Sequence, residues 1–523
     1  MVKMISATRI SVVCAAFALC LAAPASAQLF GSYTVGGDTP DFETIQHAAD
    51  SLIQAGMSGS VDVLVRPGIY TSPDSSERVL HVPGPIAGSS VLNRLRFAPD
   101  AASGADRSNV ILQRRGGTLE DGFVVAIASN HTTIESFTIQ VTDSTIGAFQ
   151  IPSAVWMTEN LDSEVRSVLV DGFDLRVSKG IRFTQCTDDM SIVGNEVYRA
   201  EWGIEFDCRF ADRLRVSDNF VAGTGSHANF QQFARDYGIR IAAISAADAR
   251  VENNVVDLTD SRTYIALSID SGPRPGFKRL TVSGNRILNW TTGNVPFGAA
   301  QAGIWVVGTS VDTRITNNLV SVTAGHQGTT RPYGIYINQY YDNVLIAHNT
   351  VYSGGTGSAA FSIVQNPVNP NRLRFLNNIA VTETAFDPAL RVEGSTEGIE
   401  ADYNSYHSES GILVSTPAGT FNTLADWQAQ GYDAHSVQKR PEFENDLLDL
   451  HLTGSSVGDT DLIGTPLPEV LFDIDGQPRD EALPYMGGDE AVPFPEGQPV
   501  ARDDNVRVFE ETVTRLEVLE NDF

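Results

Sequence analysis

A repeated phrase in the middle of the chain places chemically useful side chains at two fixed positions. The phrase is a small residue followed by alternating apolar and variable residues, as in Gly180-Ile181-Arg182-Phe183. The first variable position holds, in chain order, Arg182, Glu205, Arg240, Ser268, Trp305, Tyr336, Ser362 and Arg391. The second holds Thr184, Asp207, Ala242, Asp270, Val307, Asn338, Val364 and Glu393. Arginine binds carboxylates in a bidentate manner and aromatic rings stack on sugars, so the columns predict a groove for an extended acidic or neutral sugar polymer.

The cations of this predicted groove are candidates for catalysis. Elimination from a uronate needs a base and a cation that neutralises the sugar carboxylate. The candidate catalytic residues are Arg182, Arg240 and Lys179. The candidate substrate-binding residues are Glu205, Trp202, Tyr237, Trp305, Tyr336 and Asn338, with further aromatic residues at Tyr264, Trp290 and Tyr333. The alternative is a solvated face on which Glu205 and the arginines form a surface ion ladder worth under ~1 kcal/mol per pair.

Carboxylates in the same columns are candidates for metal binding. Calcium takes several oxygen ligands, and Glu205, Asp207 and Asp270 could supply them. The sequence therefore predicts Asp207 and Asp270 as Ca²⁺ ligands. The segment Asp473-Ile474-Asp475-Gly476 is not an EF-hand loop, because its glycine comes two positions too early.

Two cysteines follow the predicted export signal described below. Cys186 and Cys208 end the same predicted strand in successive repeats. In an oxidising compartment this placement predicts a disulfide, with stacked free thiols as the alternative. Two cysteines without a nearby histidine make a poor zinc site.

A second phrase, which ends in asparagine, alternates with the first. Its asparagines are Asn195, Asn219, Asn254, Asn285, Asn318, Asn349 and Asn378, spaced 24 to 35 residues apart. Both phrases show the period of two that is typical of short strands, and asparagine and glycine tolerate the left-handed backbone of a sharp corner. The repeat predicts an all-β parallel solenoid with coils ~4.8 Å apart. An antiparallel sandwich would need regular hairpin turns, which the sequence lacks.

The N-terminal end carries an export signal and a predicted cap. Lys3, Arg9, the apolar run from Ile10 to Ala23 and the site Ala25-Ser26-Ala27 predict a signal peptide over residues 1–27. We therefore expect a secreted or cell-surface protein without a membrane span. Thr39-Pro40-Asp41 predicts the start of a helix that covers the open edge of the first coil. The residues expected on its buried face are Phe42, Ile45, Ala49, Leu52 and Ile53.

The overall composition excludes two classes of protein. The net charge of −28 makes nucleic acid an unlikely partner, because phosphate would be repelled. The hydrophobic fraction of 42% excludes bulk disorder.

These features resemble the secreted right-handed parallel β-helix proteins of the pectate-lyase-like superfamily. The resemblance rests on Asp41-Phe42 with Ile45, on Arg66-Pro67-Gly68-Ile69-Tyr70 and on the two repeated phrases. Tail segments such as Asp473-Ile474-Asp475-Gly476-Gln477-Pro478-Arg479 and Gly487-Gly488-Asp489-Glu490 resemble the closing segment of bacterial members. The resemblance covers residues 30 to 492 and implies a right-handed parallel β-helix (solenoid) with an N-terminal capping helix. It leaves the activity open, because the superfamily contains lyases, hydrolases, esterases, epimerases and non-catalytic adhesins.

The predicted domain organisation follows from the repeat and its flanks. The segments are a cap over 28–57, a parallel β-helix over 58–410, a C-terminal capping segment over 411–492, a linker over 493–500 and a last segment over 501–523. That last segment resembles the start of a bacterial cadherin-like, immunoglobulin-type repeat, a truncated β-sandwich, with a frayed acidic tail as the alternative. We expect a monomer within a longer multi-domain chain.

Two functions remain open at this stage. The first is a polysaccharide lyase that acts on uronates, and the second is a non-catalytic carbohydrate-binding or adhesin module. A glycoside hydrolase is less favoured, because polygalacturonase-like members carry an Asp-Asp pair before the strand and a Gly-His-Gly motif. Here Asp188-Asp189 follows its strand, and His227 and His326 lie in predicted loops without that motif.

Overall fold

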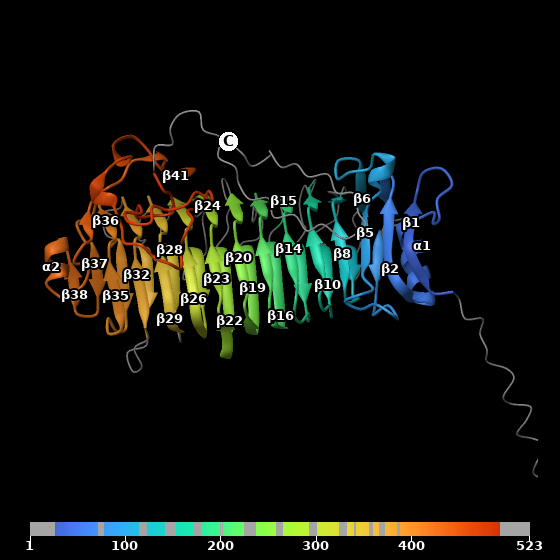
Figure 1. Cartoon of the computed structure of the whole chain (residues 1–523), viewed down its shortest axis with the longest axis horizontal. Helices are drawn as coiled ribbons and strands as arrows, with labels where there is room; N and C mark the ends of the chain where they lie inside the picture. The colour runs from blue at the N-terminus through green and yellow to red at the C-terminus, as the bar shows by residue number, and fades with distance from the viewer. Residues whose placement is uncertain are drawn as a thin grey trace, which may run out of the picture.

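The chain forms a long parallel β-helix, seen from the side in Figure 1. The structure is a computed structural model. It describes residues 27–71, 78–114, 123–141, 153–171, 179–198, 200, 202–223, 237–257, 265–291, 301–323, 332–338, 341–354, 359–365, 372–383 and 387–491. The predicted linker and cadherin-like start lie outside these residues, as does the predicted signal peptide except for Ala27. No helix among the described residues is long and apolar enough to cross a membrane.

Each coil contributes one strand to each of three faces, which we number in chain order within a coil. Face 1 contains β10 (Ser153–Thr158), β13 (Lys179–Thr184), β16 (Trp202–Phe210), β19 (Tyr237–Ala247), β22 (Ile265–Lys278), β25 (Gln301–Val307), β28 (Pro332–Asn338), β31 (Ala359–Val364) and β34 (Leu390–Glu393). Face 2 contains β11 (Glu164–Arg166), β14 (Ser191–Val193), β17 (Arg215–Ser217), β20 (Arg250–Glu252), β23 (Thr281–Ser283), β26 (Ser310–Thr316), β29 (Tyr341–Ala347), β32 (Leu373–Leu376) and β35 (Ile399–Asp402). Faces 1 and 2 belong to one hydrogen-bonded sheet.

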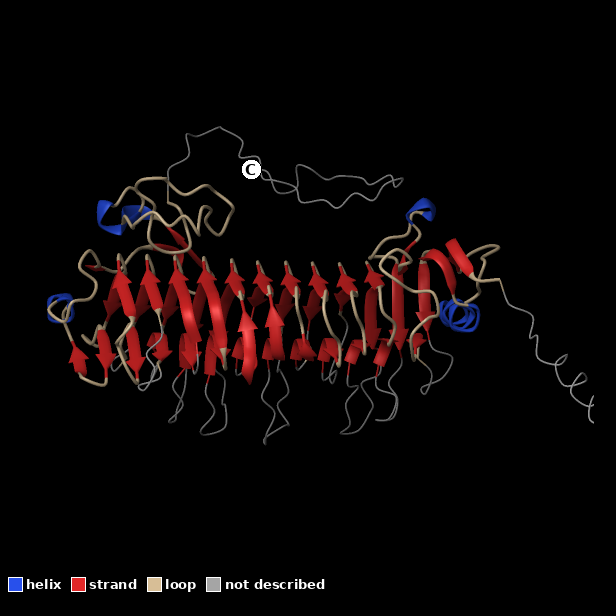
Figure 2. Cartoon of the chain, turned by 60° about the horizontal axis from the view of Figure 1, so that its bottom comes forward, coloured by secondary structure: helices blue, strands red, loops and turns tan. Residues whose placement is uncertain are grey.

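Face 3 is a separate parallel sheet. Its strands include β12 (Leu169–Val170), β15 (Glu196–Tyr198), β18 (Phe220–Ala222), β21 (Val255–Asp257), β24 (Arg286–Thr291), β27 (Leu319–Thr323), β30 (Thr350–Ser353), β33 (Ile379–Thr382) and β36 (Ser405–Ser408). Figure 2 shows that the strands of all faces stack along one axis, whereas helices are confined to the ends. The predicted parallel solenoid is confirmed.

The apolar residues of the repeated phrase form the core between the faces. Ile181, Phe183, Ile204 and Phe206 are fully buried, and the residues between them point outward. The small residue before them lies where the strands of faces 1 and 3 approach each other closely. A Cβ on Gly203 would lie 2.3 Å from Val221 Cγ1 and 2.6 Å from the Gly238 carbonyl oxygen. Glycine therefore lets the face-1 strand approach face 3 and the next coil.

The asparagines form a buried ladder at the corner between faces 2 and 3. The amide nitrogen of Asn219 donates to Oδ1 of Asn254 at 2.9 Å and to the carbonyl of Ile192 in the coil below. The same bond links Asn195, Asn219, Asn254, Asn285, Asn318, Asn349, Asn378 and Asn404 at 2.9–3.2 Å. The residues before them have positive φ, for example Asn253 at 55°. The ladder thus satisfies buried polar groups at this corner in the coils from Asn195 to Asn404.

The N-terminal helix α1 (Ile45–Ala55) packs against the first coils, but it begins later than predicted. Thr44 is its N-cap, and the predicted start at Thr39-Pro40-Asp41 is wrong. Thr39 has a φ of 48°, and Asp41 accepts hydrogen bonds from the backbone and hydroxyl of Thr34. These bonds hold the segment against β1 (Leu29–Val35). The predicted buried position of Ile53 is also wrong: Ile53 is 41% exposed, because the buried face of α1 is the stripe of Ile45, Ala48, Ala49 and Leu52, and Ile53 lies one residue beyond it.

The C-terminal segment folds back over face 3. Its strands β40 (Phe443–Asn445) and β41 (Asp449–Leu452) lie above the last coils in Figure 1. Leu450 and Met486 of this segment share a core with Leu319 and Ile379 of face 3. Arg479 donates to Asn317 at 2.9 Å, and Gly488 donates to Thr350 at 3.0 Å. Face 3 is therefore covered near the C-terminal end, whereas the outward side of face 1 carries the predicted site.

Candidate functional site

The two predicted columns are neighbours on face 1. Arg182 pairs with Glu205 across β13 and β16, and Glu205 pairs with Arg240 across β16 and β19. The same register continues through Ser268, Trp305, Tyr336, Ser362 and Arg391, and the second column follows it from Thr184 to Glu393. Side chains that are distant in sequence thus lie one coil apart.

Glu205 is the centre of a cation cluster, which we define as Lys179, Arg182, Glu205 and Arg240. Glu205 is only 2% exposed. Its carboxylate binds Lys179 Nζ, Arg182 Nε at 2.9 Å and Arg240 Nη1 at 3.3 Å. A carboxylate buried this deeply needs such partners, because desolvation of an unpaired charge costs several kcal/mol. Burial also lowers the pKa of Lys179, although Glu205 opposes the shift.

Arg240 connects the cluster to the two predicted calcium ligands. Its guanidinium lies 3.5 Å from Asp207 Oδ2 and 3.6 Å from Asp270 Oδ2. The arginine therefore takes the position between the three carboxylates in which a cation would sit. A calcium ion bound by Asp207 and Asp270 would have to displace this guanidinium, and calcium binding stays a prediction.

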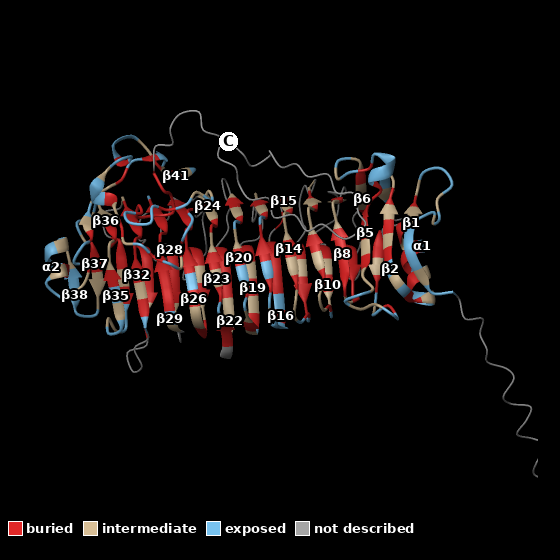
Figure 3. Ribbon diagram, in the orientation of Figure 1, coloured by how far each residue is buried: buried red, intermediate tan, exposed pale blue. Residues whose placement is uncertain are grey.

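Aromatic rings flank the cation cluster on the side of the strand beginnings. Lys179 Nζ lies 4.4 Å from the ring centroid of Trp202, and Arg240 lies 5.7 Å from it. Tyr237 meets Trp202 edge to face at 5.0 Å. Tyr237 is buried, so Trp202 is the ring of this pair that remains partly accessible. In Figure 3 the exposed positions of β16 and β19 stand out against strands that are otherwise buried or half-buried.

The other predicted binding residues form an aromatic stack two and three coils away, made of Trp305, Tyr333 and Tyr336. Trp305 and Tyr336 are nearly parallel, with centroids 4.1 Å apart, and Tyr333 lies 4.9 Å from Tyr336. Asn338 donates to the Tyr336 hydroxyl at 2.7 Å. Burial raises the pKa of Tyr336 to about 12. Because the rings cover one another, they present mainly edges, and the half-buried Trp305 is the more accessible of the stacked pair.

A disulfide joins Cys186 and Cys208 beneath the cation cluster. Their Cα atoms are 5.2 Å apart, and both residues are buried in the core. The bond ties the ends of the coils that carry Arg182 and Glu205.

One residue of the first column was missed by the sequence analysis. Trp156 of β10 pairs with Arg182, whose guanidinium lies 5.7 Å from its ring, and its indole donates to Thr184 at 2.9 Å. The signal was present, because Ala154-Val155-Trp156-Met157 is one further copy of the phrase. Of the other predicted residues, Tyr264, His227, His326 and the side chain of Trp290 lie outside the described residues.

Comparison with known proteins finds resemblance only among solved structures. No protein-family model matches the chain, and no curated protein matches it. PfbA, a surface adhesin of Streptococcus pneumoniae, aligns with 12% identity and a TM-score of 0.39 over 79% of this chain and 94% of its own. The PL6 family alginate lyase AlyGC aligns with 12% identity and a TM-score of 0.37 over 80% and 55%. The Azotobacter vinelandii mannuronan C-5 epimerase AlgE4 A-module gives 14% and 0.32 over 71% and 89%. At these scores the function must be argued from the residues of this chain.

Proposed function

We propose that face 1 binds an extended polysaccharide that contains uronates and runs along the axis of the β-helix. The observation that carries the proposal is the cation cluster, in which three cations from the two strands on either side of β16 meet at Glu205. Arg240 is the residue expected to hold the sugar carboxylate. Its contacts with Asp207 and Asp270 are long, and the Asp207 side chain is 54% exposed, so an incoming carboxylate can replace it.

The neighbouring aromatic rings support the same polymer direction. Trp202 flanks Arg240 on one side, and Trp305 lies two coils further along face 1. Adjacent coils are ~4.8 Å apart, so the aromatic rings and cations lie one after another along the axis of the β-helix and not around one closed pocket. An extended ligand can contact both regions at once.

Binding is tested by affinity electrophoresis of the chain up to Ala491 in gels that contain one of a panel of uronate polymers. Retardation by at least one polymer is expected, with a tenfold weaker affinity for Arg240→Gln. Arg279→Gln is the matched control, because Arg279 forms an exposed ion pair with Asp248 away from the cluster. Equal retardation of Arg240→Gln and the parent protein would contradict the proposal.

Cleavage by β-elimination is a second candidate, favoured by the position of the Lys179 amine, which shares the Glu205 carboxylate with Arg182 and Arg240. Burial lowers the pKa of this lysine, which makes the neutral amine more available as a base. In this candidate reaction Lys179 Nζ removes the proton next to the uronate carboxylate, and Arg182 and Arg240 stabilise the developing negative charge. The leaving sugar departs from the neighbouring carbon as the double bond forms.

Cleavage is tested by ultraviolet absorbance, since the unsaturated product absorbs and the intact polymer does not. A rise that disappears in Lys179→Met, with polymer binding retained, is the expected result for a lyase. Binding without any rise, with and without Ca²⁺, would leave a carbohydrate-binding or adhesin module as the function.

A further inference from the structure

The folded-back C-terminal segment holds a second polar cluster, well away from face 1. It consists of His451 on β41 and of Asp475 and Asp489 in the loops that follow. One ligand-type atom of each residue lies within 4.8 Å of the others. His451 Nε2 and Asp475 Oδ2 are 2.7 Å apart. Three segments of the chain therefore direct metal-ligating atoms to one point.

Asp489 supplies an oxygen that the protein does not use. The residue is 7% exposed. Its Oδ2 accepts the backbone N–H of Leu452 at 2.8 Å, whereas its Oδ1 accepts no hydrogen bond from the described residues. One oxygen of this largely buried carboxylate therefore remains available to a further ligand.

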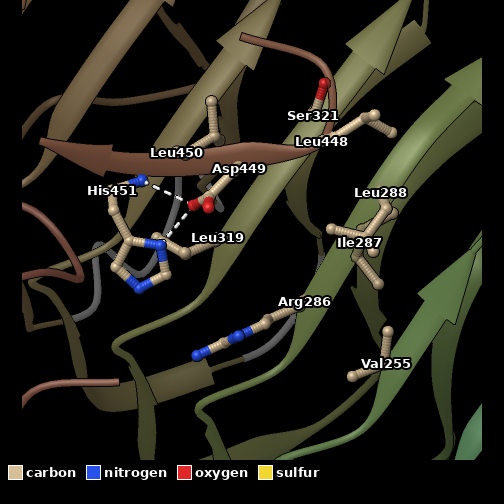
Figure 4. A pocket seen from close by; sticks show the side chains of 10 residues that line it. All are labelled: Val255, Arg286, Ile287, Leu288, Leu319, Ser321, Leu448, Asp449, Leu450 and His451. Carbon is tan, nitrogen blue, oxygen red and sulfur yellow. Dashed lines mark hydrogen bonds and ion pairs between the residues drawn. The ribbon is translucent and has the colours of Figure 1, made fainter. Parts of the chain in front are cut away.

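The surroundings orient the other two donors. Asp449 accepts a hydrogen bond from His451 Nδ1, which turns Nε2 toward Asp475, and Figure 4 shows this contact next to the pocket. Arg286 of β24 donates to Oδ1 of Asp475, and Oδ2 of the same carboxylate faces His451 Nε2. A carboxylate behind the distal nitrogen of a histidine is the usual support of a metal-ligating imidazole.

Charge and access agree with a bound cation. Asp449, Asp475 and Asp489 face Arg286, His451 and, at longer range, Arg479, so the carboxylates outnumber the two arginines and the group is negative when the imidazole is neutral, as it is in a metal ligand. The side chains of His451 and Asp475 are 21% and 17% exposed. A pocket of about 120 Å³ lies beside the group and is lined by Arg286, Asp449 and His451 among others.

We propose that His451 Nε2, Asp475 and Asp489 bind one divalent transition-metal ion, for which Zn²⁺ is the best match. One imidazole and two carboxylates are ligands that zinc accepts, and a fourth position is left for water. The bound ion joins β41 to the two final loops, and through Arg286 it fastens the segment to face 3. Its role is structural, in holding the cap on the β-helix.

The test is a calorimetric titration of Zn²⁺ into the chelator-treated full chain at pH 7.5. We expect one site, an at least tenfold weaker affinity for Asp489→Asn, and unchanged affinity for His435→Gln. His435 is the control because it forms a comparable pair with Asp402, 2.7 Å apart, on the exposed surface. Absence of zinc binding to the parent chain, or an unchanged affinity of Asp489→Asn, would overturn the proposal.

A second measurement does not depend on a folded variant. The absorption spectrum of the Co²⁺-loaded parent chain should show visible bands of a four-coordinate ion at one equivalent, and Zn²⁺ should displace them. The thermal midpoint of the parent should rise on addition of Zn²⁺, because the ion binds the folded state. No bands and no shift would mean that the His451 imidazolium and Arg286 are the only cations that the carboxylates need, and the metal site would be rejected.

Discussion

The two polar clusters of this molecule contain the same kinds of side chain but end with different charges. On face 1, Lys179, Arg182 and Arg240 meet Glu205, Asp207 and Asp270, so the charges balance. In the cap, three carboxylates face one arginine and one histidine. A balanced cluster can exchange one of its carboxylates for that of a ligand. A cluster with surplus carboxylates instead calls for a cation. The sign of the remaining charge thus distinguishes two kinds of ligand.

The largest expected effect comes from removing the centre of the balanced cluster. Glu205→Gln leaves three neighbouring cations without their shared buried carboxylate. Breaking a buried ion pair from one side costs about 3–5 kcal/mol, so urea denaturation should show a loss of that size. Asp248→Asn, which removes the exposed partner of Arg279, should cost far less, because solvent screens an exposed ion pair. A small loss for Glu205→Gln would mean that Glu205 is not required to balance the cluster.

The disulfide beneath the same cluster gives the next effect. Replacing Cys186 and Cys208 by alanine opens a loop of 22 residues, which should cost about 3 kcal/mol. Urea denaturation measures the loss. If the bond orders the cluster, polymer affinity should fall in the same variant, whereas Zn²⁺ affinity of the cap should not change. A parallel loss of both would show that the two regions are not independent.

Acid should weaken the attachment of the cap. His348 is fully buried, its Nδ1–H donates to the Tyr485 carbonyl, and its Nε2 accepts from Asn377. Burial, with a smaller contribution from Arg479, holds its pKa well below 6.5. A neutral histidine whose pKa is lower in the folded state than in the unfolded state favours the folded state at a pH above its unfolded pKa of 6.5. This contribution to the free energy of unfolding is lost progressively as the pH falls below 6.5. The loss should reach about 2 kcal/mol at pH 5.

Unfolding free energies at pH 7, 6 and 5 measure this effect. The variant His348→Gln should show a flatter profile than the parent across that range. Equal slopes for the two proteins would assign the acid sensitivity to other groups.

The smallest expected effect comes from the variant that tests whether a sugar carboxylate replaces Asp207 and Asp270 at Arg240. Asp207→Asn with Asp270→Asn removes the competitors for Arg240, so polymer affinity should rise roughly fivefold, which is about 1 kcal/mol. Affinity electrophoresis measures the change. A fall in affinity, with dependence on Ca²⁺, would instead make these carboxylates part of the binding site.

The regular part of the molecule could be predicted from the sequence because its signals repeat. The columns from Arg182 to Arg391 and the asparagine corners recur with every coil, and each copy reinforces the register of the others. The helix start could not be predicted, because the bonds between Asp41 and Thr34 outweigh the local preference of Thr39-Pro40. The cluster of His451, Asp475 and Asp489 could not be predicted either, since it depends on a fold-back between segments without a repeat.

The individual side-chain contacts on face 1 could not be predicted from the sequence either. The columns of the repeated phrase placed Glu205 between Arg182 and Arg240. They could not show that Lys179 contacts the same carboxylate, or that Arg240 lies between Asp207 and Asp270. These contacts depend on side-chain rotamers and on burial. Trp156, in contrast, followed from the alignment and required only one more copy of the phrase.

The asparagine ladder also has an electrostatic direction, because its amide dipoles are aligned. Every side-chain amide donates one N–H toward the C-terminal end and the other to a backbone carbonyl of the preceding coil, while its own oxygen, from Asn219 onward, accepts from the asparagine of the preceding coil, so eight small dipoles point the same way along the corner. The row ends where Asn404 donates to the buried carboxylate of Asp433 at 2.9 Å. A negative charge therefore terminates the positive end of the row, as an anion does at the N-terminus of a helix. A further coil of the same kind placed before this terminator would add one amide to the row and leave its polarity unchanged.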